Sequence, residues 1–332
     1  MAGWAIRRIR AKRRPMSALF ALIVAASAPQ AAASGFHEAL RAADDRLAAI
    51  GHRLATANAP LCDRLQPGLG LVVHALAQYG DDGGAARRAF GFAAPVAIEA
   101  VAAGAPADRA GVRADEALVA VDGVAVPGGG QGVVDRDRAL DLLEAGPPDR
   151  AVSLRLSAGG RVRDVAVRAA PACRARFELL LGRGLYAGAD DRVVHLGERW
   201  FEGYADAEIA VIVAHELAHI VLRHRERLDA AGVDRGVLKE FGRNGRLFRR
   251  TERDADELSV HLLANAGYDP QSAAQFWRTR GGAIDHGVFR SRTHPSSRAR
   301  AEALEATALR IATAPRLLVP AALLATRAQP LD

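Results

Sequence analysis

The spacing of apolar residues predicts a long helix near the start of the chain and a β-rich middle. Between Gly35 and about Asn58, apolar residues recur at helical spacing, which predicts an amphipathic helix ended by Ala59-Pro60. Between residues 95 and 170, short β-branched runs alternate with turns, and Gly159-Gly160 separates two alternating runs as in a hairpin. These patterns indicate an α+β fold.

A mainly helical region follows. Ala207–Leu228 is apolar nearly all round, so we expect one buried helix with Asp206 capping its first turn. A further helical pattern opens at Thr251 and runs through Leu263. The arginine-rich stretch Arg243–Arg253 is interpreted as a solvated connector.

Two histidines in the apolar helix have the spacing of a zinc site. His215 and His219 are four residues apart, so both imidazoles lie on one helix face and can reach one metal ion. Glu216, beside the first histidine, can take a proton from a zinc-bound water. The pattern predicts one Zn²⁺ per chain. His224, near the helix end, is interpreted as structural rather than as a ligand.

The next helix offers two carboxylates at the same spacing. Glu252 and Asp256 share a helix face, and Glu252 can complete a set of two histidines and one glutamate that leaves a position open for water. Asp256 can hydrogen-bond the outer nitrogen of a ligand histidine. Without the upstream motif, both would be read as an exposed charged helix face.

These motifs, together with Gly267-Tyr268-Asp269-Pro270 and His294-Pro295, resemble the CAAX prenyl protease and HtpX-like gluzincin zinc metallopeptidases, above all their soluble periplasmic members. The resemblance covers about residues 173–305. It implies that His294 lies near the zinc, as a removable ligand or as an oxyanion donor, and that Arg300 positions that segment. One departure is upstream, where Leu185–Asp190 lacks the family's usual Asn-Ala pair. Val193–Leu196 is still expected to form an edge strand for an extended peptide.

Residues 68–170 resemble a PDZ domain of exported bacterial proteases. The resemblance rests on Gly68-Leu69-Gly70-Leu71, on the Ala105–Gly111 segment and on the turn Val121-Asp122-Gly123. It implies a glycine-rich loop that binds peptide C-termini, for which Phe90-Gly91-Phe92 is a second candidate. Asp115-Glu116 replaces the family's usual Gly-Asp. The alternative is a small β domain without a ligand.

The net charge of +7 gives no case for nucleic acid, because six basic residues and no acid lie within the first 33 residues. That stretch has a basic start, an apolar run over Met16–Ala26 and small residues at Ala31–Ala33, as in a signal peptide. We therefore expect export to the periplasm, with an uncleaved inner-membrane anchor as the alternative. Membrane association is otherwise not indicated.

Export changes the interpretation of the cysteines. In an oxidising compartment, Cys62 and Cys173 are expected to form a disulfide at the base of the inserted domain, the alternative being two buried thiols.

The expected fold class is therefore α+β, a mainly helical gluzincin domain with an inserted PDZ-like domain. The division is a signal peptide (1–33), an N-terminal helix of the peptidase domain (34–66), the PDZ-like domain (67–170), the metallopeptidase domain (171–315) and a tail (316–332). The expected function is zinc-dependent hydrolysis of unfolded or misassembled envelope proteins. A periplasmic peptide-binding or chaperone-like protein with a latched zinc site is the alternative.

Overall fold

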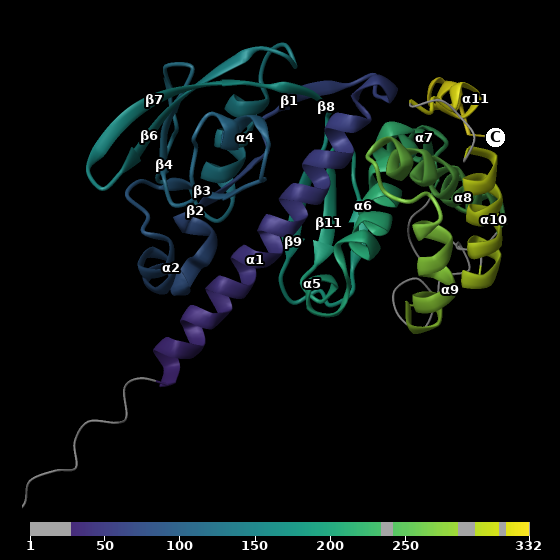
Figure 1. Cartoon of the computed structure of the whole chain (residues 1–332), viewed down its shortest axis with the longest axis horizontal. Coiled ribbons are helices and arrows are strands. Elements are labelled where there is room, and N and C mark those ends of the chain that lie inside the picture. Colours follow the sequence, from purple (N-terminus) through teal and green to yellow (C-terminus); the bar gives the residue numbers. More distant parts are fainter. Residues whose placement is uncertain (1–27, 234–241, 285–295, 312–316, 332) are drawn as a thin grey trace, which may run out of the picture.

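One long helix lies between two groups of elements in the computed structural model, which describes residues 28–233, 242–284, 296–311 and 317–331 (Figure 1). This helix, α1 (Ala28–Ala57), begins earlier than predicted and ends at the short 3-10 helix η1 (Ala59–Leu61), where the proline was expected to stop it. Leu47 and Leu54 on its apolar face are buried in the larger core. The first 27 residues, which hold most of the predicted signal peptide, lie outside the described residues.

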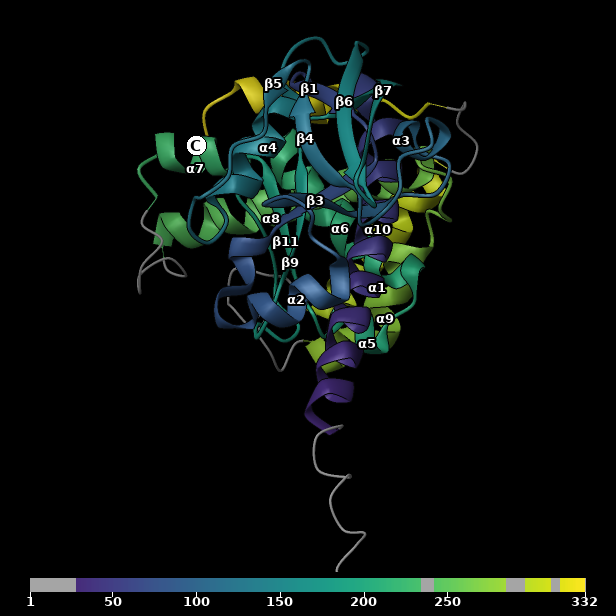
Figure 2. The ribbon, with the colours of Figure 1, turned by 90° about the vertical axis from the view of Figure 1, so that its left-hand side faces the viewer.

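The first group is a six-stranded antiparallel sheet with short helices (Figures 1 and 2). Its order is β2-β3-β4-β6-β7, and β5 pairs with β4. The strands are β2 (Leu71–Ala75), β3 (Val96–Val101), β4 (Ala117–Val121), β5 (Val124–Ala125), β6 (Ala151–Ala158) and β7 (Arg161–Arg168). The helices are η2 (Leu76–Asp82), α2 (Gly83–Phe90), α3 (Pro106–Arg109) and α4 (Val134–Glu144).

This group has its own apolar core, in which Ile98, Leu118 and Leu154 of the sheet pack with Leu143 of α4. The predicted hairpin is present as β6 and β7. Val165 and Val167 face the core opposite Leu154 and Val152, but Val162 lies on the other face of β7, opposite Ser157, and is 62% exposed.

Two sequence features complicated the PDZ resemblance, namely Asp115-Glu116 in place of Gly-Asp and the second candidate loop Phe90-Gly91-Phe92. The structure explains both. Asp115 adopts a positive φ of 67°, the conformation that a glycine allows at this turn. Phe90 and Phe92 are buried against His74, so this segment is part of a small core and not an exposed binding loop. The resemblance to a PDZ domain stays a prediction.

The second group combines a three-stranded sheet, order β10-β11-β9, with a set of helices. Its strands are β9 (Arg176–Leu180), β10 (Ala187–Ala189) and β11 (Val193–Gly197). Its helices are α5 (Trp200–Gly203), α6 (Asp206–Val221), α7 (His224–Ala230), α8 (Gly242–Asn265), α9 (Ser272–Ile284), α10 (Ser297–Ile311), α11 (Ala321–Ala325) and η4 (Thr326–Ala328). The described chain thus combines helices and sheets, and the α+β class is confirmed.

A short ladder and a disulfide join the groups. β1 (Leu65–Gly68) pairs antiparallel with β8 (Ala170–Cys173), so the chain leaves and re-enters the second group at one place. The predicted disulfide between Cys62 and Cys173 is present, with the two Cα atoms 5.4 Å apart.

Helix α1 is fixed to the second group by close contacts. A side chain at Gly51 would meet the ring of Phe177 at 2.5 Å, so the helix approaches β9 only because this residue is glycine. At its end, the Asn58 amide donates to Leu262 O of α8.

Four predictions about local structure were wrong. The zinc helix is not continuous, because Arg223 has a positive φ of 54° and separates α6 from α7. Asp206 is not the cap, since the Glu208 carboxylate accepts the Ala205 N–H. Of the predicted connector Arg243–Arg253, every residue belongs to α8. Val193–Leu196 lies in β11, which has a neighbour on each side and is no edge strand.

The C-terminal tail packs on the second group. Leu324 joins the larger core, and Leu331 packs against Leu228, Val233 and Leu247. Among the described residues, no helix is long and apolar enough to cross a bilayer.

Candidate metal centre

Three side chains from two helices converge on one point. His215 and His219 come from α6, and Glu252 comes from α8, which packs against α6. The His215 Nε2 lies 3.3 Å from Glu252 Oε2, and the His219 Nε2 lies 3.6 Å from Glu252 Oε1. The two Nε2 atoms are 3.2 Å apart. All three ligand atoms fall within 4.8 Å of one another, which suits one tetrahedral zinc ion with protein ligands at about 2.0–2.2 Å.

The cluster is buried on one side and open on the other. The side chains of His215 and Glu252 are 7% and 10% exposed, whereas that of His219 is 18% exposed. Solvent therefore reaches the cluster beside His219, where a catalytic zinc site needs a free coordination position. Glu216, which follows the first ligand in α6, is buried as well.

Asp256 holds the outer nitrogen of His215. The His215 Nδ1 lies 2.9 Å from Asp256 Oδ1, so this nitrogen carries the hydrogen and leaves Nε2 free to bind metal. Asp256 forms a two-pronged ion pair with Arg300 of α10, whose Nε lies 2.8 Å from Oδ2. Arg300 is only 3% exposed and stacks on the Trp277 ring.

His224 contacts the outer nitrogen of His219, as Asp256 contacts that of His215. Its Nδ1 lies 2.9 Å from the His219 Nδ1, so His219 donates and His224 accepts. Burial, together with the nearby His219 and Arg227, holds the pKa of His224 well below its usual value, which keeps it neutral as an acceptor must be. His224 was interpreted from the sequence as structural rather than as a ligand, but this contact was not predicted. The turn at Arg223 directs the His224 side chain toward the metal centre, and no glycine in the sequence marks this turn.

The electrostatic potential around the ligand atoms is strongly negative. Burial opposes a charge on His215, yet the hydrogen bonds to Asp256 and Glu252 raise its pKa to about 10. Burial would also raise the pKa of Asp256, but Arg300 and His215 hold it at about 2. Two carboxylates beside two imidazoles thus favour positive charge at this point, which is what a dication supplies.

The remaining predicted residues are placed as follows. Arg300 lies in the second layer of the centre, beside Asp256. His294 lies outside the described residues, so both roles implied for it stay predictions. The segment Leu185–Asp190, which lacks the family's Asn, contains β10, an edge of the three-stranded sheet that packs against α6.

Part of the sequence that forms this centre matches a known protein family. Residues 242–308, which include α8 and Arg300, match Peptidase family M48. The M48 match supports the gluzincin assignment, but the narrower CAAX and HtpX-like resemblance is not confirmed by it.

Two relatives carry the name mitochondrial metalloendopeptidase OMA1. The one from Arabidopsis thaliana is 33% identical over 122 residues, covering 30% of this chain and 24% of the relative. The one from Schizosaccharomyces pombe is 30% identical over 118 residues, covering 29% of this chain and 35% of the relative. The chain thus spans about a quarter to a third of these relatives. No solved structure matches significantly.

These comparisons bear on two predictions. The M48 match and the two metalloendopeptidases support the predicted zinc metalloendopeptidase. The predicted periplasmic localisation, with its inner-membrane alternative, was wrong, because both relatives are named as mitochondrial proteins. A basic and apolar leader alone was too general a signal to identify the compartment.

Proposed function

We propose that this protein is a zinc endopeptidase that hydrolyses polypeptides presented in an extended conformation. The observation that carries the proposal is the convergence of His215, His219 and Glu252 within 4.8 Å, with exposure on the His219 side. The proposed metallopeptidase domain comprises residues 171–315 with the helix of residues 34–66. The PDZ-like insertion (67–170) and the tail (316–332) complete the division.

The donor set fits zinc, since two neutral imidazoles and one carboxylate are common ligands of catalytic Zn²⁺. When bound there, the ion acts as a Lewis acid and lowers the pKa of a coordinated water. His215 and His219 bind through Nε2, because their Nδ1 atoms face Asp256 and His224. Glu252 supplies the third ligand oxygen from the neighbouring helix.

Glu216 is the proposed general base. It accepts a proton from the attacking water and passes it to the nitrogen of the departing amine, so no covalent bond to the protein forms. Its burial next to His215 favours proton transfer over solvation of the carboxylate. We also propose that His294 lies near the reacting carbonyl, as ligand or donor.

The edge strand β10 is the proposed platform for substrate. It pairs with β11 on one side only and packs against α6, which carries the ligands. An extended peptide can pair with such an edge through its main chain. Because a folded protein pairs or buries most of its extended backbone, unfolded or misassembled proteins are the substrate class we propose, and protein quality control is the proposed role.

The test compares Glu216→Gln with the wild type and with Glu202→Gln, a control that removes one carboxylate from α5. Zinc content is measured by mass spectrometry, and cleavage is measured on casein. We expect one zinc per chain in all three proteins and a loss of about 10²–10⁴-fold in cleavage rate for Glu216→Gln alone.

Two results would contradict this proposal. If Glu216→Gln kept its zinc and cleaved as fast as the wild type, Glu216 would not be the base. If the wild type, Glu202→Gln and an additional His294→Ala variant, which removes the proposed latch, all bound zinc without cleaving casein, a peptide-binding role would be favoured instead.

A further inference from the structure

A second cavity lies between the two groups of elements. Its volume is about 270 Å³, and none of its lining residues is a candidate metal ligand. Since an apolar cavity of roughly 150 Å³ holds a benzene molecule, this space accommodates more than one side chain. It is bounded by β2 and α4 of the first group, by β9 of the second group and by α1.

The edges of two sheets border this cavity. The successive residues Leu71–Val73 of β2 line it, and so do the successive residues Arg176–Leu179 of β9. Because side chains alternate between the faces of a strand, an unbroken run means that the edge of the strand borders the space. In the described chain β2 and β9 are both edge strands, each paired on one side only. Their exposed main chain can accept an added strand.

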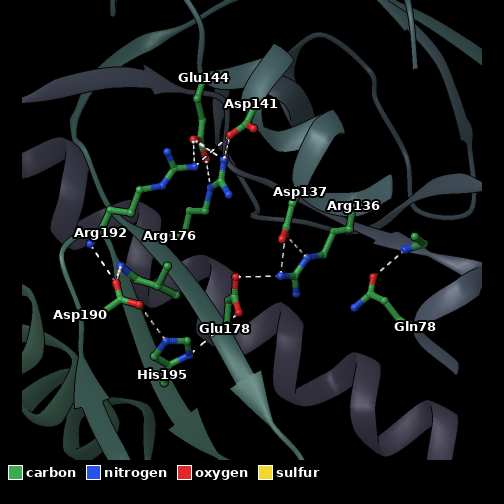
Figure 3. A network of polar contacts seen from close by, with 12 residues as sticks. Gln78, Arg136, Asp137, Asp141, Glu144, Arg176, Glu178, Asp190, Arg192 and His195 are labelled. Carbon is green, nitrogen blue, oxygen red and sulfur yellow. Dashed lines mark hydrogen bonds and ion pairs between the residues drawn. The ribbon is translucent and has the colours of Figure 1, made fainter. Parts of the chain in front are cut away.

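The edge of β2 has a defined end. The Ala75 N–H donates to the Gln78 side chain at 2.7 Å and is therefore not available to a ligand (Figure 3). The part of the edge that borders the cavity precedes this cap.

The cavity wall is more acidic than basic. Four carboxylic acids line it, against two arginines, and each arginine is already paired. Arg136 contacts Asp137 and Glu178, and Arg176 contacts Asp141 and Glu144 (Figure 3).

The other two acids, Asp44 of α1 and Glu99 of β3, hydrogen-bond to each other. Glu99 is 5% exposed, its Oε1 has no hydrogen-bond partner among the described residues, and the His74 Nδ1 lies 3.6 Å from it. Burial and the neighbouring Glu99 raise the pKa of Asp44 to about 9. A proton is therefore held by this pair, and no arginine in the described part of the chain lies within ion-pair distance of it.

We propose that this cavity binds an extended segment of a substrate polypeptide with a basic side chain, whose main chain lies along β2 and whose cation contacts Asp44 and Glu99. The apolar lining, including Leu69, Leu140 and Phe177, accepts the neighbouring apolar side chains. Recognition then requires a lysine or arginine within the segment. It does not require a free C-terminus, which is the group that the PDZ resemblance implies is bound. The identity of the ligand as substrate rests on the proposed function, but its binding does not.

The experiment measures peptide binding to the full chain carrying Glu216→Gln, by fluorescence anisotropy. The probe is a labelled peptide of about six residues, the usual length of a strand, with alternating valine and lysine and both ends blocked. Matched peptides replace lysine by norleucine, or lack lysine and carry a free C-terminal carboxylate. The protein variants add Glu99→Gln, Asp44→Asn or the control Glu302→Gln, which removes a carboxylate from the exposed face of α10.

We expect the blocked lysine peptide to bind about tenfold or more tightly than the norleucine peptide, because a charge-assisted contact is lost in the latter. Glu99→Gln should weaken lysine-peptide binding by a similar factor, and Glu302→Gln should leave it unchanged. If Glu99→Gln fails to fold, Asp44→Asn provides the same comparison.

Tighter binding of the free-carboxylate peptide, unaffected by Glu99→Gln, would overturn the proposal in favour of C-terminal capture. Absence of binding by every peptide would also overturn it. Failure of the wild-type protein to cleave casein, with peptide binding intact, would count against the peptidase proposal alone, so the two can fail separately.

Discussion

Replacing Asp256 by asparagine tests whether the buried ion pair holds the metal centre. The change keeps the shape of the side chain and an oxygen that can still accept the His215 Nδ1–H, but it removes the negative charge. Arg300 then stays 3% exposed, stacked on Trp277, without its carboxylate. Because arginine stays protonated in proteins, its buried charge then remains without a partner.

The magnitude follows from burial. Removing one partner of a buried ion pair costs about 3–5 kcal/mol, because the remaining charge is left desolvated. The adjacent residue provides the control, since Glu257 pairs with Arg310 across the same two helices at 3.3 Å, with side chains 47% and 60% exposed. Glu257→Gln should cost about 0–1 kcal/mol. The double variant Asp256→Asn/Arg300→Met should recover much of the loss, because no buried charge remains.

Urea unfolding of the metal-free proteins measures these free energies, and competition with a chelator measures zinc affinity. We expect Asp256→Asn to weaken zinc binding by about 10–100-fold, since the outer partner of His215 is altered. The reasoning is refuted if Asp256→Asn costs no more than Glu257→Gln, or if Arg300→Met fails to rescue it.

Three further predictions concern other parts of the chain. His224→Phe removes the acceptor for His219 and should weaken zinc binding by about 10–100-fold in a chelator competition, whereas His261→Phe, a buried histidine outside the centre, should change it little. Replacing both Cys62 and Cys173 by serine should lower the free energy of unfolding by up to about 4–5 kcal/mol and make the melting temperature insensitive to reductant; an unchanged stability contradicts this. The pKa of Asp44 is raised from 3.8 to about 9, so the folded state binds the extra proton and stability falls as pH rises between these values. Asp44→Asn should flatten that slope in denaturation measured from pH 5 to pH 9, and a slope equal to that of the wild type rules the explanation out.

The cluster of candidate metal ligands could be predicted from sequence because its residues are spaced one helical turn apart within each helix. His215 and His219 are one helical turn apart, and so are Glu252 and Asp256, so each helix brings its pair to one face whatever the rest of the chain does. Only the packing of α6 against α8 had to be assumed. A buried Ala255 next to the interface is consistent with that close approach.

The features that could not be predicted depend on single backbone conformations or on strand order. Arg223 ends α6 with a positive φ, although arginine gives no sign of it, and this turn is what brings His224 to His219. The position of β11 inside its sheet was missed for another reason. An alternating run reveals a strand but not its neighbours, and β9 joins β11 in parallel across the connection that contains β10.

The strand order also separates the two proposed sites, one for catalysis and one for recognition. The three-stranded sheet has two edges, of which β10 packs against the helix with the metal ligands and β9 borders the acidic cavity. Since neighbouring strands are about 4.8 Å apart, roughly 10 Å of sheet lies between the two edges. A peptide of strand length that pairs along one edge leaves the other edge free, whereas an unfolded polypeptide is long enough to pair along both. A basic segment held at the cavity would then raise the local concentration of the remaining chain at β10, so it would lower KM for long substrates without changing the chemistry at Glu216.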